Sequence, residues 1–246
     1  MPRFFVGTDQ ISDKNIVITG TDVNHIRNVL RMAPGEDVTV SDGQGMDYFC
    51  KITELTKEEV RLDIIDSWHS FVELPAKIYL FQGLPKADKM ELIIQKAVEL
   101  GVYEIVPVAT KRAVVKLDAK KEEKKRLRWQ SIAESAAKQA GRALIPQVAP
   151  CMNFDKALRM CNGLDAALIP YEKAEGMQHA RDQVRALHGK HSIGIFIGPE
   201  GGFEESEIEA ARGAGAVPIT LGHRILRTET AGLTMLSILM FELEED

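Results

Sequence analysis

Two glycine-rich segments near the C-terminal end limit most strongly what this chain can fold into. The first, at 198–202, has the sequence Gly-Pro-Glu-Gly-Gly and follows the apolar run 192–197. The second, at 221–231, follows the apolar run 216–221. Each run is typical of a strand buried on both faces, and each loop precedes a helical pattern. Two such loops should lie side by side at one edge of a parallel sheet, where open α/β folds bind their ligands.

The glycines of the first loop allow backbone N–H groups to approach a ligand closely, because glycine has no side chain. Glu204, Glu205 and Glu207 place negative charge at the start of the next helix, which argues against a phosphate there. The spacing also matches neither the P-loop nor the dinucleotide-binding sequence. Taken alone, this loop is explained equally well as a tight turn without a ligand.

The second loop carries more charge than most strand-to-helix connections. Arg224 and Arg227 beside a glycine-rich neighbour favour an anionic or polar ligand, because a guanidinium donates several hydrogen bonds at once. His223 is weaker evidence, since a single loop histidine is usually only solvated. Thr228 is the predicted N-cap of the helix that follows.

From residue 75 onward the sequence alternates between strand and helix patterns, which predicts a parallel sheet with helices on both faces. Gly101 is expected to end the first of these helices as its C′ residue. The predicted strands are 77–82, 104–109, 165–170, 192–197 and 216–221. The predicted helices are 86–100, 120–140, 154–161, 178–187 and 229–243.

Before residue 70 the segments are short and rich in β-branched residues, which predicts a small β-barrel. The expected strands are 15–19, 37–41, 48–53 and 59–65. A short helix is expected over 22–32 with Thr21 as its N-cap, and 68–75 is expected to be a linker. The sequence therefore predicts two domains, 1–72 and 73–246.

The two C-terminal loops resemble the second and third motifs of the SPOUT RNA methyltransferases. Three further stretches fit the same family: 83–86 running into 94–101, 134–142, and 25–31. The resemblance spans nearly the whole chain and is strongest to the bacterial enzymes that methylate N3 of a uridine in 16S ribosomal RNA of the small subunit. It implies an α/β SPOUT fold with a deep C-terminal trefoil knot, preceded by a PUA-like RNA-binding β-barrel. Periodicity alone predicts no knot, because chains are generally unknotted.

The resemblance implies S-adenosylmethionine as the cofactor, bound in a bent shape inside the knot. Backbone groups of the two loops would bind its polar edges, and apolar side chains would pack against its adenine. The cofactor supplies the methyl group, and the protein supplies position and electrostatics. The residues implied in cofactor binding are Ile169, Gly198, Pro199, Glu200, Gly201, Gly202, Leu221, Gly222, Ile225, Leu226, Thr228, Thr230 and Ala231.

Methyl transfer to uridine N3 requires that the N3 proton leaves and that the negative charge on the ring is stabilised. Arg227, in the third motif, is the first candidate for the stabilising group, with a structural loop anchor as its alternative role. Arg142, at the end of the first motif, is a second candidate and would come from the other subunit of a dimer. Glu200 is either the proton acceptor or a structural carboxylate bonded to nearby backbone N–H groups. The target base must be unpaired or flipped out to present N3.

The net charge of −5 does not indicate a nucleic-acid partner, so local charge matters more. Residues 111–128 carry nine Lys or Arg against three Asp or Glu. Such a run is either a solvated helix face or a phosphate-contacting patch, and the resemblance favours the patch. The expected partner is 16S ribosomal RNA, either free or within the assembled small subunit. The residues expected to contact it are Arg3, Arg27, Arg31, Lys86, Arg112, Lys124, Lys125 and Arg128.

Composition excludes several classes of protein. The chain has 246 residues of which 45% are hydrophobic, which supports a sizeable core. No apolar stretch reaches transmembrane length, and the start lacks the layout of a signal peptide. Cys50, Cys151 and Cys161 are odd in number and lack C-x-x-C spacing. They fit free thiols in a reducing cytosol, so we expect a cytoplasmic protein without disulfides or a metal site.

The last predicted helix, 229–243, is apolar nearly all round and must therefore be buried on more than one side. It is either sandwiched within its own domain or part of a homodimer interface, and the resemblance favours the homodimer.

Three other functions compete with uridine N3 methylation. A SPOUT ribose 2′-O-methyltransferase would use the same cofactor site with a different acceptor. A non-enzymatic RNA-binding protein would not bind the cofactor. A dinucleotide oxidoreductase is disfavoured, because the sequence G-x-G-x-x-G is missing.

Overall fold

A computed structural model describes residues 1–115, 117–174 and 176–244. The chain forms two compact units, defined by the contacts within each. Unit 1 consists of Met1–Glu73 and Ala137–Ile145, and unit 2 of Leu74–Ala136 and Pro146–Asp246. Residues 137–145 belong with unit 1, which the sequence pattern does not predict.

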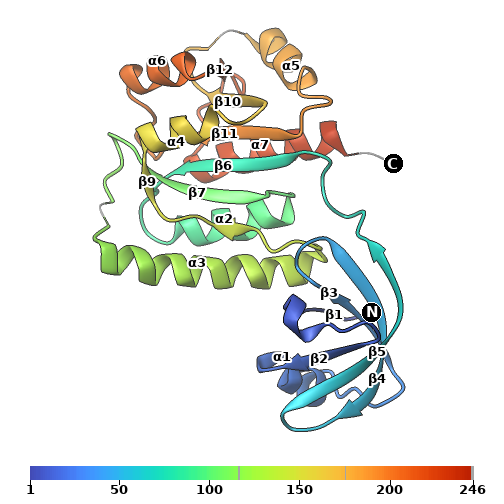
Figure 1. The fold of residues 1–246 in the computed structure, drawn as a ribbon. Coiled ribbons are helices and arrows are strands. Elements are labelled where there is room, and N and C mark those ends of the chain that lie inside the picture. Colours follow the sequence, from blue (N-terminus) through green and yellow to red (C-terminus); the bar gives the residue numbers. More distant parts are fainter. Residues whose placement is uncertain (116, 175, 245–246) are drawn as a thin grey trace. The chain divides into compact units, whose positions relative to one another are not determined.

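Unit 1 is built on one five-stranded sheet with strand order β1-β3-β4-β5-β2 (Figure 1). Its elements are β1 (Arg3–Phe5), η1 (Thr8–Gln10), β2 (Asn15–Thr19), β3 (Asp37–Ser41), β4 (Met46–Leu55) and β5 (Glu59–His69). Alternate residues of β2, such as Ile16 and Ile18, point into a buried cluster with Val38 and Leu62. Among the described residues the ladders run from β1 to β2 without closing into a ring. Since β5 continues to His69, the predicted linker from residue 68 begins too early.

The predicted helix 22–32 is shorter in the structure and starts one residue earlier. It comprises α1 (Thr21–Asn24) and the π-helical turn η2 (His25–Val29). Thr21 is the first helical residue and Gly20 is the N-cap, so the predicted cap is wrong. The helix cannot reach residue 32, because Arg31 has a left-handed backbone with φ 56°.

Residues 137–145 join unit 1 mainly through Arg142, whose side chain is 5% exposed. Its Nε donates to Oε2 of Glu73 at 2.8 Å. The other oxygen of Glu73 accepts the backbone N–H of Ala143 at 2.8 Å, and the Ser41 hydroxyl donates to the Ala143 carbonyl at 3.0 Å. A buried ion pair with all these hydrogen bonds fixes the segment firmly, because its charges are compensated on several sides.

Unit 2 contains the predicted parallel sheet, with strand order β12-β10-β11-β6-β7-β8 and with β9 beside β7 (Figure 1). Its strands are β6 (Lys77–Gly83), β7 (Glu104–Ala109), β8 (Gln147–Val148), β9 (Met152–Asn153), β10 (Ala166–Pro170), β11 (Ser192–Ile197) and β12 (Ala216–Ile219). Every pairing between them is parallel. The α/β class predicted from the alternating pattern is therefore confirmed.

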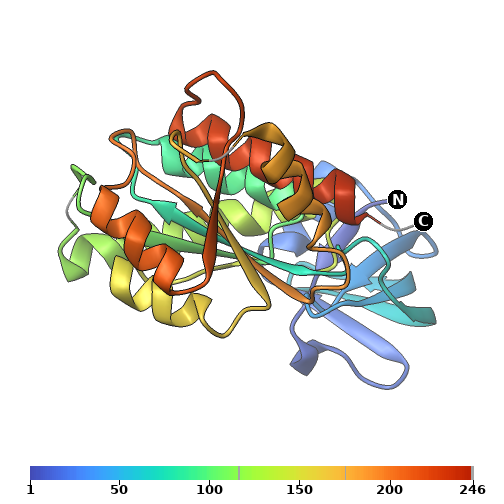
Figure 2. The same ribbon diagram turned by 90° about the horizontal axis from the view of Figure 1, so that it is seen from above.

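Helices cover both faces of this sheet, with α4 and α6 on one face and α2, α5 and α7 on the other (Figure 2). Their bounds are α2 (Lys89–Glu99), α3 (Ala119–Ala140), α4 (Phe154–Cys161), α5 (Met177–Arg185), α6 (Glu205–Gly213) and α7 (Thr228–Leu243). The predicted start of α2 at residue 86 is too early, because Ala87 has φ 53° and interrupts the helix. The predicted stop is confirmed, since Leu100 is the C-cap and Gly101 follows with φ 88°.

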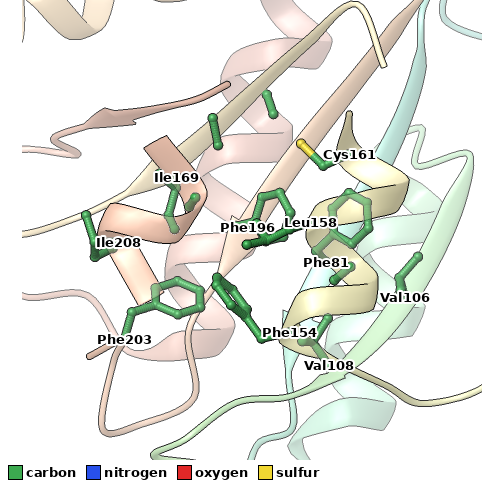
Figure 3. Packing of buried hydrophobic residues seen from close by; sticks show 14 of the residues in the cluster. Phe81, Val106, Val108, Phe154, Leu158, Cys161, Ile169, Phe196, Phe203 and Ile208 are labelled. Carbon is green, nitrogen blue, oxygen red and sulfur yellow. The ribbon is translucent and has the colours of Figure 1, made fainter. Parts of the chain in front are cut away.

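The apolar core on the α4 and α6 face is built around aromatic rings (Figure 3). Phe81 of β6 and Phe196 of β11 occupy paired positions, and their rings stack with centroids 4.4 Å apart. Phe154 of α4 meets Phe196 edge-on at 5.9 Å. Burying one such ring stabilises the fold by about 2 kcal/mol. The core therefore fixes β6 and β11, the two strands from which the candidate site extends.

No helix within the described ranges is both long enough and apolar enough to cross a bilayer.

Candidate active site

The loops that the sequence analysis singled out lie at one edge of the unit 2 sheet. The parallel strands β6, β10, β11 and β12 all end there, at Gly83, Pro170, Ile197 and Ile219. The shared edge is as predicted, but β10 lies between β11 and β12, so the strands that lead into the two loops are not neighbours. This is the carboxyl edge, where doubly wound sheets hold ligands.

The glycine loop, residues 198–202, packs against the end of β6 without room for a side chain. A Cβ added to Gly83 would lie 2.7 Å from both Cδ and N of Pro199. The loop turns back through a 2.9 Å hydrogen bond from Gly202 N to the Pro199 carbonyl. Gly202 has φ 66°, which favours glycine, and an added Cβ there would meet nothing within 4 Å. The space that a side chain would occupy at Gly202 is therefore open.

Gly201, by contrast, is packed against a side chain. An added Cβ at Gly201 would lie 3.2 Å from Cβ of Arg112, and Nη1 of Arg112 donates to the Gly201 carbonyl at 3.0 Å. The backbone N–H of Lys111 donates to Glu207 at 2.9 Å, and Nζ of Lys111 donates to Ser206 at 2.8 Å. Residues 111–112, which follow β7, therefore bond both to the glycine loop and to the first turn of α6.

A buried set of hydrogen bonds, the inner tie, joins Gln82, Thr228 and Gly198. Gln82 is fully buried at the end of β6, and its Nε2 donates to the Thr228 hydroxyl at 2.9 Å. The Thr228 hydroxyl lies 2.6 Å from the Gly198 carbonyl oxygen, to which it donates. The predicted cap at Thr228 is wrong, because Thr228 is already helical and Arg227, with extended backbone, is the N-cap of α7. The Thr228 hydroxyl bonds to the glycine loop instead.

A charged set of contacts, the outer tie, joins Glu200, Lys86, Lys89 and Glu229. Glu200 accepts the backbone N–H of Lys86 at 3.1 Å and lies 3.0 Å from Nζ of Lys89. The same Nζ lies 3.3 Å from Oε2 of Glu229 in the first turn of α7. Burial by itself raises the pKa of the Glu200 carboxyl, but the hydrogen bonds from Lys89 and from backbone amides outweigh it and lower that pKa. Glu200 thus stays ionised and engaged, which matches the structural role weighed for it.

The second loop presents a glycine with open space beside it and some apolar surface. Gly222 has φ 108°, and an added Cβ there would meet nothing within 4 Å. Leu221, Leu226 and Ala231 are half-buried. Ile225 is 88% exposed. The apolar residues expected to hold a cofactor therefore differ widely in their exposure.

Ile169, expected at the cofactor, has its side chain in the core between β10 and α6, next to Ile208 (Figure 3). Only its backbone, at the end of β10, is part of the sheet edge. Thr230 is exposed on α7.

The two arginines considered for catalysis have different surroundings. Arg227 is exposed at the start of α7, and within the described ranges no ion pair or side-chain hydrogen bond engages its guanidinium. Arg142 lies in unit 1, where Glu73 holds its buried guanidinium. Of these two arginines, only Arg227 has a guanidinium without a partner among the described residues.

The residues expected to contact RNA include both free and engaged side chains. Arg3 lies 2.9 Å from the buried carboxylate of Asp47, Arg128 lies 2.8 Å from Glu91, and Lys125 lies over the ring of Trp129. The remaining residues are exposed, although Arg112 also donates to the Gly201 carbonyl: Arg27, Arg31, Lys86, Arg112 and Lys124. Lys116, within the basic run, lies outside the described residues.

Three residues that hold the site together were not predicted from the sequence: Gln82, Lys89 and Glu229. Gln82 had a detectable signal, because it is a polar residue at the end of an otherwise apolar strand. The two charged residues lie on α2 and α7 at positions typical of a solvated first helical turn. Nothing in their spacing indicates that they share a partner.

One face of α7 remains uncovered. Phe241 is 84% exposed and Ile238 39% exposed. They line an open groove of about 550 Å³ together with Thr230, Leu233, Thr234, Ser237 and Glu242. Ile238 and Phe241 thus bring two large apolar side chains to the surface of this groove.

Comparison with known families assigns both units. Residues 72–240 match the RNA methyltransferase domain, and residues 18–65 match the RNA methyltransferase PUA domain. A ribosomal RNA small subunit methyltransferase E of Bacillus subtilis is 38% identical over 250 residues, which cover 99% of this chain and 98% of the relative.

Two solved structures are similar over nearly their whole length. One is a ribosomal RNA small subunit methyltransferase E from Neisseria gonorrhoeae bound to S-adenosylmethionine. It has a TM-score of 0.84 and 34% identity, covering 98% of this chain and 97% of that one. The other is a methyltransferase from Legionella pneumophila in complex with the cofactor SAM, with a TM-score of 0.83 and 33% identity over 97% of this chain and 96% of that one.

Proposed function

Because this chain belongs to the RNA methyltransferase family, with a PUA domain ahead of the methyltransferase domain, we propose that it methylates 16S ribosomal RNA of the small subunit. S-adenosylmethionine is the methyl donor, and N3 of a uridine is the acceptor. The observation that carries this proposal is full-length similarity to small-subunit methyltransferases, one of them bound to this cofactor. Residues 1–72 would bind RNA and residues 73–246 would carry the reaction.

The residues at the sheet edge fit S-adenosylmethionine. Gly202 and Gly222 have positive φ and open space where a side chain would lie, which lets a ligand approach the main chain closely. Leu221 and Leu226 offer half-buried apolar surface for an adenine ring. When bound, the cofactor supplies a methyl group on a positively charged sulfur, and the chain supplies its position.

Arg227 is the residue to which we assign the stabilisation of charge. A uridine ring becomes negatively charged as N3 loses its proton, and the charge is shared with O2 and O4. A free guanidinium donates hydrogen bonds to such oxygens and gains most from them near the transition state. Glu200 is assigned to the outer tie instead of proton transfer, because its carboxylate is engaged by Lys86 and Lys89.

RNA contacts are assigned to the exposed basic residues. Arg27 and Arg31 of unit 1 and Lys86, Arg112 and Lys124 of unit 2 are accessible to phosphates. Phosphate contacts position an RNA without selecting its sequence. The uridine would be chosen by the site at the sheet edge.

A trefoil knot at the C-terminal end is part of this proposal. Two observations support it. β12 lies at the far edge of the sheet, whereas α7, which follows it, packs against α2 and β11. The chain between them must therefore return past the ends of β10 and β11, close to the glycine loop that Thr228 contacts.

A homodimer formed through α7 completes the proposal. The groove lined by Ile238 and Phe241 supports it, because a second copy of the same helix would cover these side chains. In a symmetric dimer the same face serves both subunits.

Transfer of labelled methyl groups tests the proposed function. The purified protein is incubated with labelled S-adenosylmethionine and either free 16S ribosomal RNA or small-subunit particles lacking the modification. We expect incorporation into at least one of the two substrates. Calorimetry that detects no S-adenosylmethionine binding would contradict the proposal, and so would binding without transfer to either substrate.

A further inference from the structure

Gln82 is unusual for its position in the sheet. The strand β6 has the apolar sequence Ile-Tyr-Leu-Phe at 78–81 and then the fully buried amide of Gln82. Burial of an amide is unfavourable unless its hydrogen bonds are replaced. An apolar residue would therefore be expected at this position unless the amide performs a task.

Among the described residues, only the nitrogen of this amide makes hydrogen bonds. Its Nε2 donates to the Thr228 hydroxyl at 2.9 Å and to the Gly83 carbonyl at 3.0 Å. Its Oε1 has no hydrogen-bond partner within the described residues and faces Gly232 of α7. The contribution of Gln82 therefore lies in what its nitrogen donates.

Donation by Gln82 fixes the direction of the next hydrogen bond. A hydroxyl has one proton to donate and lone pairs to accept. Since Gln82 donates to the Thr228 oxygen, the Thr228 proton is left for the Gly198 carbonyl, 2.6 Å away. Without the donor at residue 82, this hydroxyl is free to rotate toward other acceptors.

The Gly198 carbonyl is the first group of the glycine loop. The hydrogen bond from Thr228 fixes the peptide between Gly198 and Pro199. The next residue, Pro199, packs against Gly83. The rest of the loop, including Gly202 with its open side, follows directly from this fixed peptide. A loop held in its binding conformation binds a ligand more tightly, because less ordering is required on binding.

We propose that Gln82 is a positioning residue for the cofactor: it orients the Thr228 hydroxyl toward Gly198 and so holds the glycine loop ready to bind. This inference rests on the proposed function, in which S-adenosylmethionine binds at this sheet edge. It assigns Gln82 no contact with the cofactor or the RNA.

Four variants test the proposal: Thr228→Val, Thr228→Ser, Gln82→Met and the double variant Gln82→Met/Thr228→Val. Valine keeps the shape of threonine without the hydroxyl, and serine keeps the hydroxyl. Affinity for S-adenosylmethionine is measured by calorimetry on variants that unfold cooperatively. We expect Thr228→Val and Gln82→Met each to bind about tenfold more weakly, as for the loss of one hydrogen bond. Thr228→Ser should stay within about threefold of the wild type, because its hydroxyl makes the same bond.

The double variant separates a shared role from two independent ones. If both residues act through one hydroxyl, it should bind no more weakly than the poorer single variant. Independent packing effects would instead multiply to about a hundredfold loss.

Hydrogen exchange on the cofactor-free protein supplies a second readout. Thr228→Val and Gln82→Met should speed amide exchange at 198–203, and Thr228→Ser should not. Because no cofactor is present, the exchange experiment tests the inner tie even if the wild type does not bind S-adenosylmethionine. A wild type that does not bind it would count against the proposed function alone. Wild-type exchange and affinity in Thr228→Val would overturn the inference, and so would a serine variant as impaired as the valine variant.

Discussion

The carboxylate of Glu200 lies 3.0 Å from Nζ of Lys89, so the carboxylate of the glycine loop is paired with the first residue of α2. It also accepts the backbone N–H of Lys86, and these bonds keep its pKa below the ordinary 4.5. A general base works best when its pKa lies near the working pH. The pairing therefore favours the structural role of Glu200 over proton transfer.

Glu200→Gln should reduce the single-turnover methylation rate by less than about tenfold at saturating cofactor and RNA, since loss of a general base costs about 100- to 10,000-fold. The matched control is Glu205→Gln, which removes an exposed carboxylate nearby in α6. A thousandfold loss confined to Glu200→Gln would return Glu200 to the role of proton acceptor.

The same residue predicts a pH dependence of stability. A folded-state pKa below the ordinary 4.5 means that the contribution of Glu200 is present above that value and is lost as the pH falls below it. Glu200→Gln should therefore lower the free energy of unfolding at pH 7, by less than about 1 kcal/mol because the pair is partly solvated. In urea unfolding near pH 3, the variant and the wild type should differ less, and an equal or larger difference there would contradict the assignment.

Arg227→Ala should lose about 100- to 1000-fold in the rate of methyl transfer, as for removal of one group that stabilises a developing negative charge. Its affinity for S-adenosylmethionine should change little, because the cofactor sulfur is positively charged and gains nothing from a guanidinium. Single-turnover rates and calorimetry separate the two effects. Arg224→Ala, exposed in the same loop, is the control. If Arg227→Ala lost its cofactor affinity instead, Arg227 would be a loop anchor.

Two glycines offer a matched pair of alanine substitutions. Gly83→Ala places a methyl group 2.7 Å from the backbone N of Pro199, which must shift the glycine loop and weaken cofactor binding by more than about tenfold. Gly232→Ala places its methyl 3.5 Å from Gln82 and 3.7 Å from Ile197, which is ordinary contact. It should bind normally and raise the free energy of unfolding by about 0.5–1 kcal/mol, because alanine favours a helix. Calorimetry and thermal unfolding of both variants check this; equal affinities would show that the loop tolerates the displacement.

Phe241→Glu should convert a dimer into a monomer at micromolar concentration, because a charge would be buried in the proposed interface. Phe241 is 84% exposed in the single chain, so the substitution should leave the unfolding of the monomer nearly unchanged. Light scattering measures both proteins. A wild type that is monomeric would contradict the homodimer.

Much of unit 2 could be predicted from the sequence, because its strands are short apolar runs and its helices have one apolar face. The bounds of α4 and β11 match the prediction at both ends. Where the prediction fails, long-range contacts decide. Thr228 has the residue type and position of an N-cap, but its hydroxyl bonds to a loop 30 residues away.

The organisation of unit 1 shows the same limit. Arg142 lies in a motif that the resemblance assigns to the methyltransferase domain, yet its guanidinium is bound by Glu73, which is 69 residues away in sequence. No periodicity indicates such a pair. Gly201 and Gly202 are likewise indistinguishable in sequence, but one packs against Arg112 and the other is open.

Identification of the methylated nucleoside tests the central claim most directly. Small-subunit ribosomal RNA is methylated by the purified protein with labelled S-adenosylmethionine, digested to nucleosides and separated with mass detection. The account predicts that the label is in 3-methyluridine and that Arg227→Ala, under the same conditions, yields little of it. Label in a 2′-O-methyl nucleoside, or in any base other than uracil, would contradict it.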